Sequence, residues 1–381
     1  MSDIYADIRP FNDNEVKAVL ERLAASEELV GALLKQRFPG WPAAVLLALR
    51  PLFHWRLRAQ LQRLTSVEKF QMWLEPQIEQ LLQRSTSVVE VSGLENLDPG
   101  KAHVWISNHR DIAMDPTMIN YSLHQAGWPT SRIAIGDNLL QNPDVADVMR
   151  LNKSFVVKRS IANKRQKLRE LQRLSGYIRH SAEQGQSVWI AQREGRAKDN
   201  RDKTDTAVLK MLALHGRERN ESFAETMQQL NPVPVSIQYE WDPCDQLKAA
   251  ELVAVAQCGD YSKADDEDVR SILLGLTGQK GRVKVNFGQP LATAQLQDAD
   301  MMAAAIDQQI AEMAEIWPVH QAALSLLRQQ WPQHDWPELA DNSDIAAKRQ
   351  QLLQRLAGND DVIRRQMLEN YAAPLLLPVA P

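Results

Sequence analysis

The sequence predicts an α/β fold with a central mixed sheet flanked by helices, and with helical sections added at both ends of the chain. Between residues 86 and 290, short apolar segments rich in β-branched and aromatic residues alternate with segments of helical spacing, which is the pattern of a layered α/β domain. Outside this range the apolar residues recur at helical spacing alone. We therefore expect a helical section at 1–85, an α/β domain at 86–290 and a helical section at 291–381.

The front section is predicted to be helical from Asn14 to about Arg84. Prolines at 39, 42 and 51 interrupt the helical spacing, because proline removes a backbone donor and clashes with the preceding turn. Thr65 or Ser66 is placed to cap a further helix. We expect separate helices on either side of these interruptions.

The middle section is predicted to contribute seven strands and four helices. The strands are expected at 87–92, 103–107, 132–135, 154–157, 187–191, 234–239 and 282–287. The helices are expected at 116–125, 162–183, 205–215 and 265–276. From about Leu291 the spacing is helical again, up to a proline-rich segment from Ala373 to Pro381.

Composition excludes several classes of protein. The chain has two cysteines and a formal net charge of −4, so we expect neither a disulfide framework nor a nucleic-acid partner. No apolar run approaches the roughly 20 residues that span a bilayer. The first residues carry acids and lack an apolar core of signal-peptide length, so we expect a cytoplasmic protein.

One segment places a histidine between acids at the end of a strand. The apolar run Trp105-Ile106 leads into His109, which is followed by Asp111 and Asp115. A loop leaving a buried strand is a suitable place for a general base whose imidazole is held by a carboxylate. A structural interpretation is equally open, because Asp115 before Pro116 also has the pattern of a helix cap.

Three later segments also contain apolar strands, and two of these strands are followed by charged residues or glycine. Lys158 and Arg159 follow the strand at 154–157 and could present charge to a phosphate. Glu194, Gly195 and Arg196 follow the strand at 187–191, where glycine allows close backbone approach and arginine can grip a phosphate with two donors. The fourth segment, 231–237, is a strand with prolines at its start.

In order and spacing, these four segments resemble the blocks of the glycerolipid acyltransferase family, which includes glycerol-3-phosphate and lysophosphatidic acid acyltransferases. Asn108-His109 matches the start of the first block, NHxxxxD. Phe155 to Arg159 resembles the second block, and Gln192 to Arg196 resembles the third, FPEGTRS. Val233 to Ile237 resembles the apolar fourth block. The resemblance covers about residues 85–290.

The blocks also depart from the family pattern. Asp115 follows His109 by six residues where the family spacing is five, so either Asp115 with a one-residue bulge or Asp111 would orient the imidazole. Gln192-Arg193 stands where Phe-Pro is usual, and Arg196 follows the glycine directly. These departures suggest a divergent subgroup with a different acceptor.

The resemblance implies the reaction and its participants. His109 and Asp115 are the expected catalytic residues. The expected substrate-binding residues are Asn108, Lys158, Arg159, Glu194, Gly195 and Arg196. The donor would be an acyl-carrier protein or coenzyme A thioester and the preferred acceptor lysophosphatidic acid, with neither metal nor cofactor. Glycerol 3-phosphate, another lysophospholipid or an amino-acid lipid precursor are alternative acceptors, and the rival interpretation is a non-catalytic lipid-binding or scaffold protein.

The front section offers a separate indication of where the protein works. From Trp41 to Leu64 there are four arginines, two tryptophans and no acids, as in helices that lie on anionic membranes. Alternatively, the apolar residues between Leu46 and Leu57 pack against the catalytic core. A lipid substrate favours a peripheral position on the inner face of the membrane.

Overall fold

The computed structural model describes residues 3–38, 40–264, 266–338 and 345–376. The chain divides into two compact units. One unit combines Met1–Gln80 with Ser131–Tyr177, and the other combines Leu81–Thr130 with Ile178–Pro381. Neither unit is a continuous stretch of chain.

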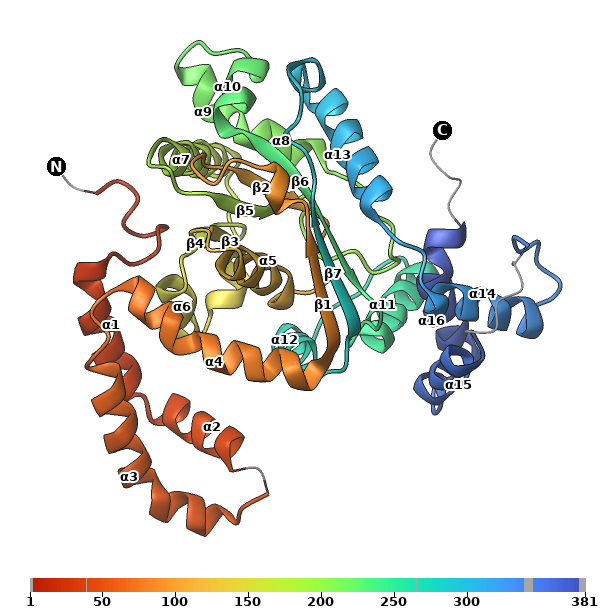
Figure 1. Cartoon of the computed structure of the whole chain (residues 1–381), viewed down its shortest axis with the longest axis horizontal. Helices are drawn as coiled ribbons and strands as arrows, with labels where there is room; N and C mark the ends of the chain where they lie inside the picture. The colour runs from red at the N-terminus through yellow and green to blue at the C-terminus, as the bar shows by residue number, and fades with distance from the viewer. Residues whose placement is uncertain (1–2, 39, 265, 339–344, 377–381) are drawn as a thin grey trace. The chain divides into compact units, whose positions relative to one another are not determined.

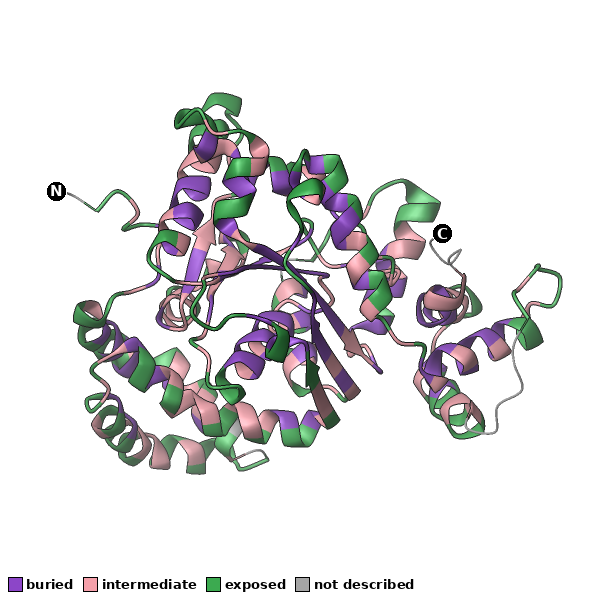
Figure 2. Cartoon of the chain, turned by 45° about the horizontal axis from the view of Figure 1, so that its top comes forward, coloured by how far each residue is buried: buried purple, intermediate pink, exposed green. Residues whose placement is uncertain are grey.

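The larger unit is built on five strands of mixed direction. They are β1 (Thr86–Ser92), β2 (Val104–Ser107), β5 (Val188–Ala191), β6 (Pro232–Tyr239) and β7 (Gly281–Phe287), in the spatial order β1-β7-β6-β2-β5 (Figure 1). Only the β6–β7 pair is antiparallel. All four residues of β2 are buried, and the central strands are coloured as buried over most of their length in Figure 2. Continuous apolar strands of this kind belong to sheets covered on both faces.

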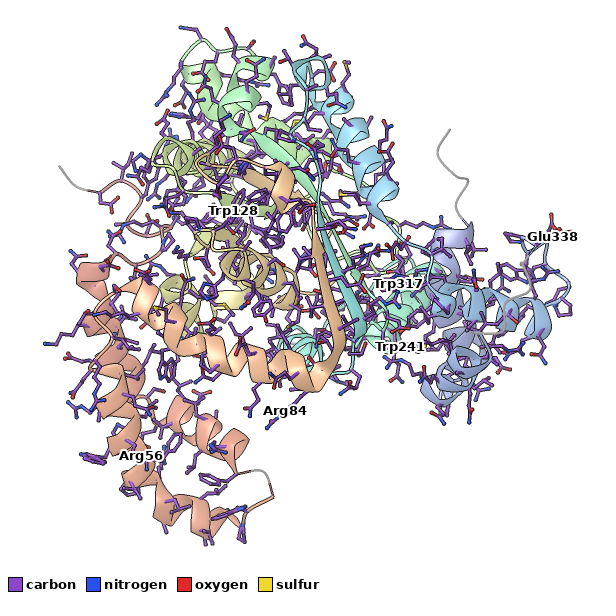
Figure 3. All side chains as sticks on the ribbon, viewed as in Figure 1. Arg56, Arg84, Trp128, Trp241, Trp317 and Glu338 are labelled. Atoms are coloured by element: carbon purple, nitrogen blue, oxygen red, sulfur yellow. The ribbon has the colours of Figure 1, made fainter. Side chains whose placement is uncertain are left out.

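Helices surround these strands within the same unit. They are α5 (Met114–Gln125), α8 (Thr206–Leu212), α9 (Leu214–Glu218), α10 (Phe223–Leu230), α11 (Asp245–Cys258), α12 (Glu267–Thr277), α13 (Ala299–Met313), α14 (Pro318–Gln330), α15 (Ile345–Leu356) and α16 (Asp361–Leu376), with short 3₁₀ turns at Leu94–Asn96 and Thr293–Leu296. The last three form a bundle whose apolar core includes Trp241 and Trp317, labelled in Figure 3. Helix α16 continues through Pro374, so the expected proline-rich segment is helical up to Leu376, and the remainder lies outside the described residues.

The smaller unit contains a parallel pair of strands and a group of helices. The strands are β3 (Arg132–Gly136) and β4 (Ser154–Val157). The helices are α1 (Asp13–Ala25), α2 (Glu27–Arg37), α3 (Ala43–Leu61), α4 (Val67–Ser85), α6 (Pro143–Leu151) and α7 (Lys164–Glu183), with a 3₁₀ turn at Asp137–Leu140. Of α4 and α7, only the residues up to Gln80 and up to Tyr177 belong to this unit. Leu57 and Leu61 of α3 pack into an apolar core shared with α1, α2, α4 and α6.

The prediction that Pro51 breaks a helix is wrong. Pro51 lies inside α3. The carbonyl that loses its donor belongs to Leu47, which is exposed, so water can satisfy it and the helix continues. The predicted cap at Ser66 is confirmed, because its Oγ accepts a hydrogen bond from the Lys69 amide at 3.2 Å, at the start of α4.

The seven predicted strands are confirmed to within two residues at each end. Three helices of the middle section, α6, α10 and α11, were not predicted. In α11, Lys248 and Glu251 are buried because they form ion pairs with Asp242 and Lys198. Charged residues therefore occupy buried positions of the helix. The helix lacks the apolar stripe along one side from which an amphipathic helix is predicted.

The limits of the predicted sections agree with secondary structure but not with the compact units. Helix α4 ends at Ser85, β1 begins at Thr86, and β7 ends at Phe287. The smaller unit nevertheless takes residues 131–177 from the predicted α/β section. The three-part division into domains therefore stays a prediction. No described helix has both the length and the apolar character needed to cross a bilayer.

Candidate active site

The candidate site lies in the larger unit, where the carboxyl ends of three neighbouring strands meet. Strands β5 and β6 both run parallel to β2 and pair with it, so the residues that follow each of them emerge at one edge of the sheet. Two backbone hydrogen bonds tie the first two loops together: Gln192 N donates to Ser107 O at 2.8 Å, and Ala197 N donates to His109 O at 2.7 Å. The loop carrying His109 is therefore held against the loop after β5.

His109 is paired with Asp115. Nδ1 of His109 donates to Oδ2 of Asp115 at 2.8 Å, since a carboxylate accepts only. Asp115 is fully buried, whereas the His109 side chain is 15% exposed. The ring packs edge-to-face on Trp189 of β5, with centroids 5.8 Å apart. This arrangement fixes the imidazole and leaves Nε2 to take a proton from a reactant.

Asp111 occupies a different place in the same loop. Its Oδ1 accepts hydrogen bonds from the amides of Ala113 (3.0 Å) and Met114 (2.8 Å), where α5 begins. The Asp111 side chain therefore satisfies amides at the start of the helix, where Ala113 is the N-cap residue. The interpretation of Asp115 as the cap is wrong, since Asp115 lies in the first turn. Burial, followed by the neighbouring charge of Asp115, raises the pKa of Asp111. Of the two acids, only Asp115 contacts the imidazole within the described residues.

Helix α12 approaches this loop closely. A Cβ added to Gly275 would lie 2.1 Å from Oδ2 of Asp111, so only glycine lets the helix pack there. Lys280, at the end of the following turn, is fully buried, and burial lowers its pKa to about 8 despite the opposing effect of Asp111. The cap of α5 is thus covered by protein.

A partly buried network of charges surrounds the loop, and it was not predicted from the sequence. Arg110 Nη2 lies 2.6 Å from Asp202 Oδ2, and Arg110 Nη1 donates to Asn200 at 2.5 Å. Lys248 Nζ donates to the Arg110 carbonyl at 2.7 Å and forms an ion pair with Asp242. Asp202 and Lys248 lie in segments with no motif to mark them, so only the fold reveals that they meet Arg110.

Tyr239 is a further residue that sequence analysis missed. It ends β6, and its hydroxyl donates to Asp115 Oδ1 at 2.9 Å. The available signal was its position at the end of the strand expected at 234–239, but the sequence did not predict which strands would be neighbours.

Asn108 is held by protein groups. Its Oδ1 accepts from the amide of Ile237 at 2.8 Å, and its Nδ2 donates to the Ile237 carbonyl at 3.0 Å and to Asp202 Oδ2 at 3.2 Å. This buried amide joins the histidine loop to β6. These contacts give Asn108 a positioning role, and the substrate contact expected from the sequence stays a prediction.

The third block lies beside His109. Gly195 has a φ of 76°, in the left-handed region where glycine is preferred. Arg196 Nη2 donates to Ser271 of α12 at 3.2 Å, while its Nη1 is buried and has no partner among the described groups. Glu194 and Gly195 are exposed. Arg196 therefore contacts protein through Nη2, and its Nη1 remains a donor without a partner among the described groups.

Lys158 and Arg159 belong to the smaller unit. Lys158 Nζ lies 2.7 Å from Asp7 Oδ2 and 3.3 Å from Glu170 Oε2. The amide of Arg159 donates to Asp137 at 3.1 Å, and a Cβ on Gly136 would lie 3.0 Å from Arg159 Nε. Lys158 is thus paired with two acids, and the phosphate-binding role predicted for both residues stays a prediction.

Comparison with known proteins identifies the type of domain. Residues 88–237 match the family model described as Acyltransferase, and this range contains His109, Asp115 and all four sequence blocks. No curated protein matches the chain. Among solved structures, the chain is similar to the 1-acyl-sn-glycerophosphate (LPA) acyltransferase PlsC from Thermotoga maritima, with 12% identity and a TM-score of 0.39, over 79% of this chain and 96% of that one.

Proposed function

We propose that this chain transfers a fatty acyl group from a thioester donor to a hydroxyl of a glycerolipid acceptor, because residues 88–237 match the family model described as Acyltransferase. This match agrees with the acyltransferase family predicted from the sequence blocks. The observation that carries the proposal is the contact between His109 and the buried carboxylate of Asp115 inside the matched residues. An imidazole oriented by a carboxylate can act as the general base that removes the proton of the acceptor hydroxyl.

The proposed chemistry follows from the free nitrogen of the imidazole. Nε2 of His109 takes the proton of the acceptor hydroxyl as its oxygen attacks the thioester carbonyl. The tetrahedral intermediate then expels the thiolate, which receives that proton from the imidazolium. Asp115 stabilises the positive charge that develops on His109 meanwhile. The acyl group thus passes directly from the sulfur of the donor to the oxygen of the acceptor, and no acyl-enzyme forms.

The proposal extends to the substrates expected from the sequence. The preferred acceptor is lysophosphatidic acid, and the donor is an acyl-carrier protein or coenzyme A thioester. The unpartnered buried donor of Arg196 beside the His109 loop supports an acceptor with an anionic group, because guanidinium groups bind phosphate well. Arg159, Lys158, Glu194 and Gly195 are proposed to bind the rest of the acceptor.

The test is acyl transfer by the purified chain to lysophosphatidic acid, glycerol 3-phosphate and other lysolipids, with both thioester donors. We expect product with at least one acceptor, and a loss of about 10²–10⁴-fold in kcat for His109→Ala. Circular dichroism establishes that the variant is folded. An inactive panel, or a variant as active as the parent, would favour the non-catalytic lipid-binding interpretation.

The protein is also proposed to work at an anionic membrane surface. The large apolar residues of α3 and its preceding turn that are exposed are Trp41, Val45, Leu47, Leu52 and Trp55. Arg56 and Arg58 of α3 are exposed as well, and Arg56 is labelled on this helix in Figure 3. Exposed apolar and cationic side chains on one helix support binding in the interface of an anionic bilayer.

A further inference from the structure

Asp115 accepts more hydrogen bonds than the contact with His109 requires. Its Oδ2 accepts from Nδ1 of His109 and from the amides of Arg110 (2.6 Å) and Asp111 (2.9 Å). Its Oδ1 accepts from the hydroxyl of Tyr239 at 2.9 Å. Among the described contacts the phenol is the sole partner of Oδ1. Two backbone amides and the imidazole thus hold Oδ2, whereas the position of Oδ1 depends on the Tyr239 side chain alone among the described contacts.

The fold holds the phenol firmly in this position. Tyr239 lies at the end of β6, where it pairs with Val283 of β7 in the antiparallel ladder. Asn108 joins the other side of the strand to the histidine loop through Ile237. Burial and then the charge of Asp115 raise the pKa of Tyr239 well above its ordinary value, which favours the protonated hydroxyl that donates to Asp115.

We propose that Tyr239 is a positioning residue that sets the basicity of His109 by withdrawing charge from Asp115. This inference rests on the proposed function in so far as His109 is the base. A hydrogen bond to Oδ1 spreads the negative charge of the carboxylate away from Oδ2, which faces the imidazole. The imidazolium is then less strongly stabilised, and His109 binds a proton less tightly than it would beside an Asp115 without Tyr239. The phenol also stops the carboxylate from turning away from the ring.

Other charged groups lie around the loop and are common to any variant of Tyr239. Asp111 and Asp202 interact electrostatically with Asp115. Asp242, Lys248 and Lys280 interact in the same way with Asp111, and Arg110 interacts with Asp202. Asp202 pairs with Arg110, and Asp242 pairs with Lys248. A difference in the His109 titration between two proteins that differ only at Tyr239 therefore reports the phenol itself.

The experiment compares the full-length parent with Tyr239→Phe. The titration midpoint of His109 is measured by NMR of its ring protons, assigned with His109→Ala, and kcat/KM is measured from acidic to alkaline pH. We expect Tyr239→Phe to move this midpoint upward by about half a pH unit to one pH unit. The acidic limb of kcat/KM should move to higher pH by the same amount, with kcat at its plateau reduced about 10-fold.

The matched control is Tyr371→Phe. Tyr371 is buried, and its hydroxyl, like that of Tyr239, donates to a buried carboxylate, that of Asp245, at 2.8 Å. Its loss should cost comparable stability and leave the His109 titration unchanged. A Tyr239→Phe protein whose His109 titrates as in the parent would overturn the proposal and leave Tyr239 a packing residue.

The NMR titration separates this inference from the proposed reaction. If no acceptor is acylated but the midpoint of the His109 titration rises in Tyr239→Phe, the proposed function fails and the coupling stands. Should Tyr239→Phe not fold, 3-fluorotyrosine placed at position 239 provides the second test. Its more acidic hydroxyl donates more strongly, so the midpoint should fall, and an unchanged or raised value would overturn the proposal.

Discussion

The loop after β2 accommodates one residue more between its histidine and aspartate than the family spacing provides. Asp111 takes the amides of Ala113 and Met114, so the chain closes a tight turn before α5 starts. Asp115, in the first turn of the helix, then points back to His109 and to the amides of Arg110 and Asp111. A small side-chain cap thus absorbs the extra residue and keeps the carboxylate on the imidazole.

At the residue scale, Asp115→Asn tests what the carboxylate contributes. The amides of Arg110 and Asp111 need an acceptor, so the side-chain oxygen of the introduced asparagine should keep the place of Oδ2 and preserve the imidazole tautomer. Only the charge is lost. We expect kcat to fall about 10²-fold or more, and the acidic limb of the pH–rate profile to move to lower pH, because the imidazolium is no longer stabilised.

This shift is opposite in sign to the one expected for Tyr239→Phe. Asp111→Asn serves as the control, because Asp111 contacts the helix start and not the imidazole. If Asp115→Asn retained the activity and the pH profile of the parent, the carboxylate would have no part in catalysis.

At the element scale, α3 is exposed to solvent over much of its length. Leu57 and Leu61 pack into the core of the smaller unit, but Leu52, expected to pack, is 58% exposed, and Trp55 is 68% exposed. Leu57 therefore packs within the helical group of its own unit, and membrane binding by the exposed residues of this helix stays a proposal. Its inner face stabilises the helical group, and its outer face is available to a partner.

Membrane binding by α3 is tested with sedimentation of the protein on vesicles that contain anionic lipid. Binding should weaken with rising salt, because screening reduces the attraction between exposed charges. Replacing Arg50, Arg56, Arg58 and Arg63 with glutamine should reduce binding by at least about 10-fold. The matched control replaces four exposed arginines elsewhere, at positions 84, 217, 270 and 328. Binding that ignored salt and survived the α3 replacements would contradict the electrostatic part of the proposal.

At the scale of the whole molecule, the structure predicts a specific weakness in acid. His320 of α14 is 5% exposed and accepts a hydrogen bond from the Trp317 amide at 3.2 Å through Nδ1. Burial, and then the nearby Arg110, lower its pKa to about 4. The folded protein therefore keeps this histidine neutral to a lower pH than the unfolded chain, in which the histidine pKa is about 6.5.

Because of this difference in histidine pKa, the folded protein should become less stable as the pH falls. Stability is fully present above the unfolded pKa of about 6.5 and is lost as the pH falls towards 4, because the unfolded state then binds more protons. We expect this histidine alone to cost the parent about 2 kcal/mol of unfolding free energy between about pH 7 and pH 5. Denaturant unfolding followed by tryptophan fluorescence at both pH values measures the loss.

His320→Gln should lose less stability between these two pH values than the parent, because glutamine keeps an acceptor for the Trp317 amide and does not titrate. His334→Gln, at an exposed position, is the control and should behave as the parent does. An equal pH dependence in all three proteins would contradict the assignment to His320.

Much of this protein could be predicted from local sequence. The seven strands, the cap at Ser66 and the histidine at the end of β2 follow from apolar spacing and turn chemistry within a few residues. Local patterns failed at Pro51, where α3 continues because the Leu47 carbonyl that loses its donor is exposed to water. They also failed at α11, whose buried charges are paired with residues brought to them by the fold.

Sequence patterns alone were enough to predict the α/β class, the family resemblance and His109 with two candidate acids. The contact between Asp115 and the imidazole could be identified only in three dimensions, since it depends on how one loop folds against α5. The tertiary structure also decided that Tyr239, Asp202 and Lys248 join the site, because they come from β6, the loop after β5 and α11. The physical reason is that hydrogen bonds and ion pairs act over a few ångströms in space, and residues that lie far apart in the sequence become neighbours only when the strands have taken their order.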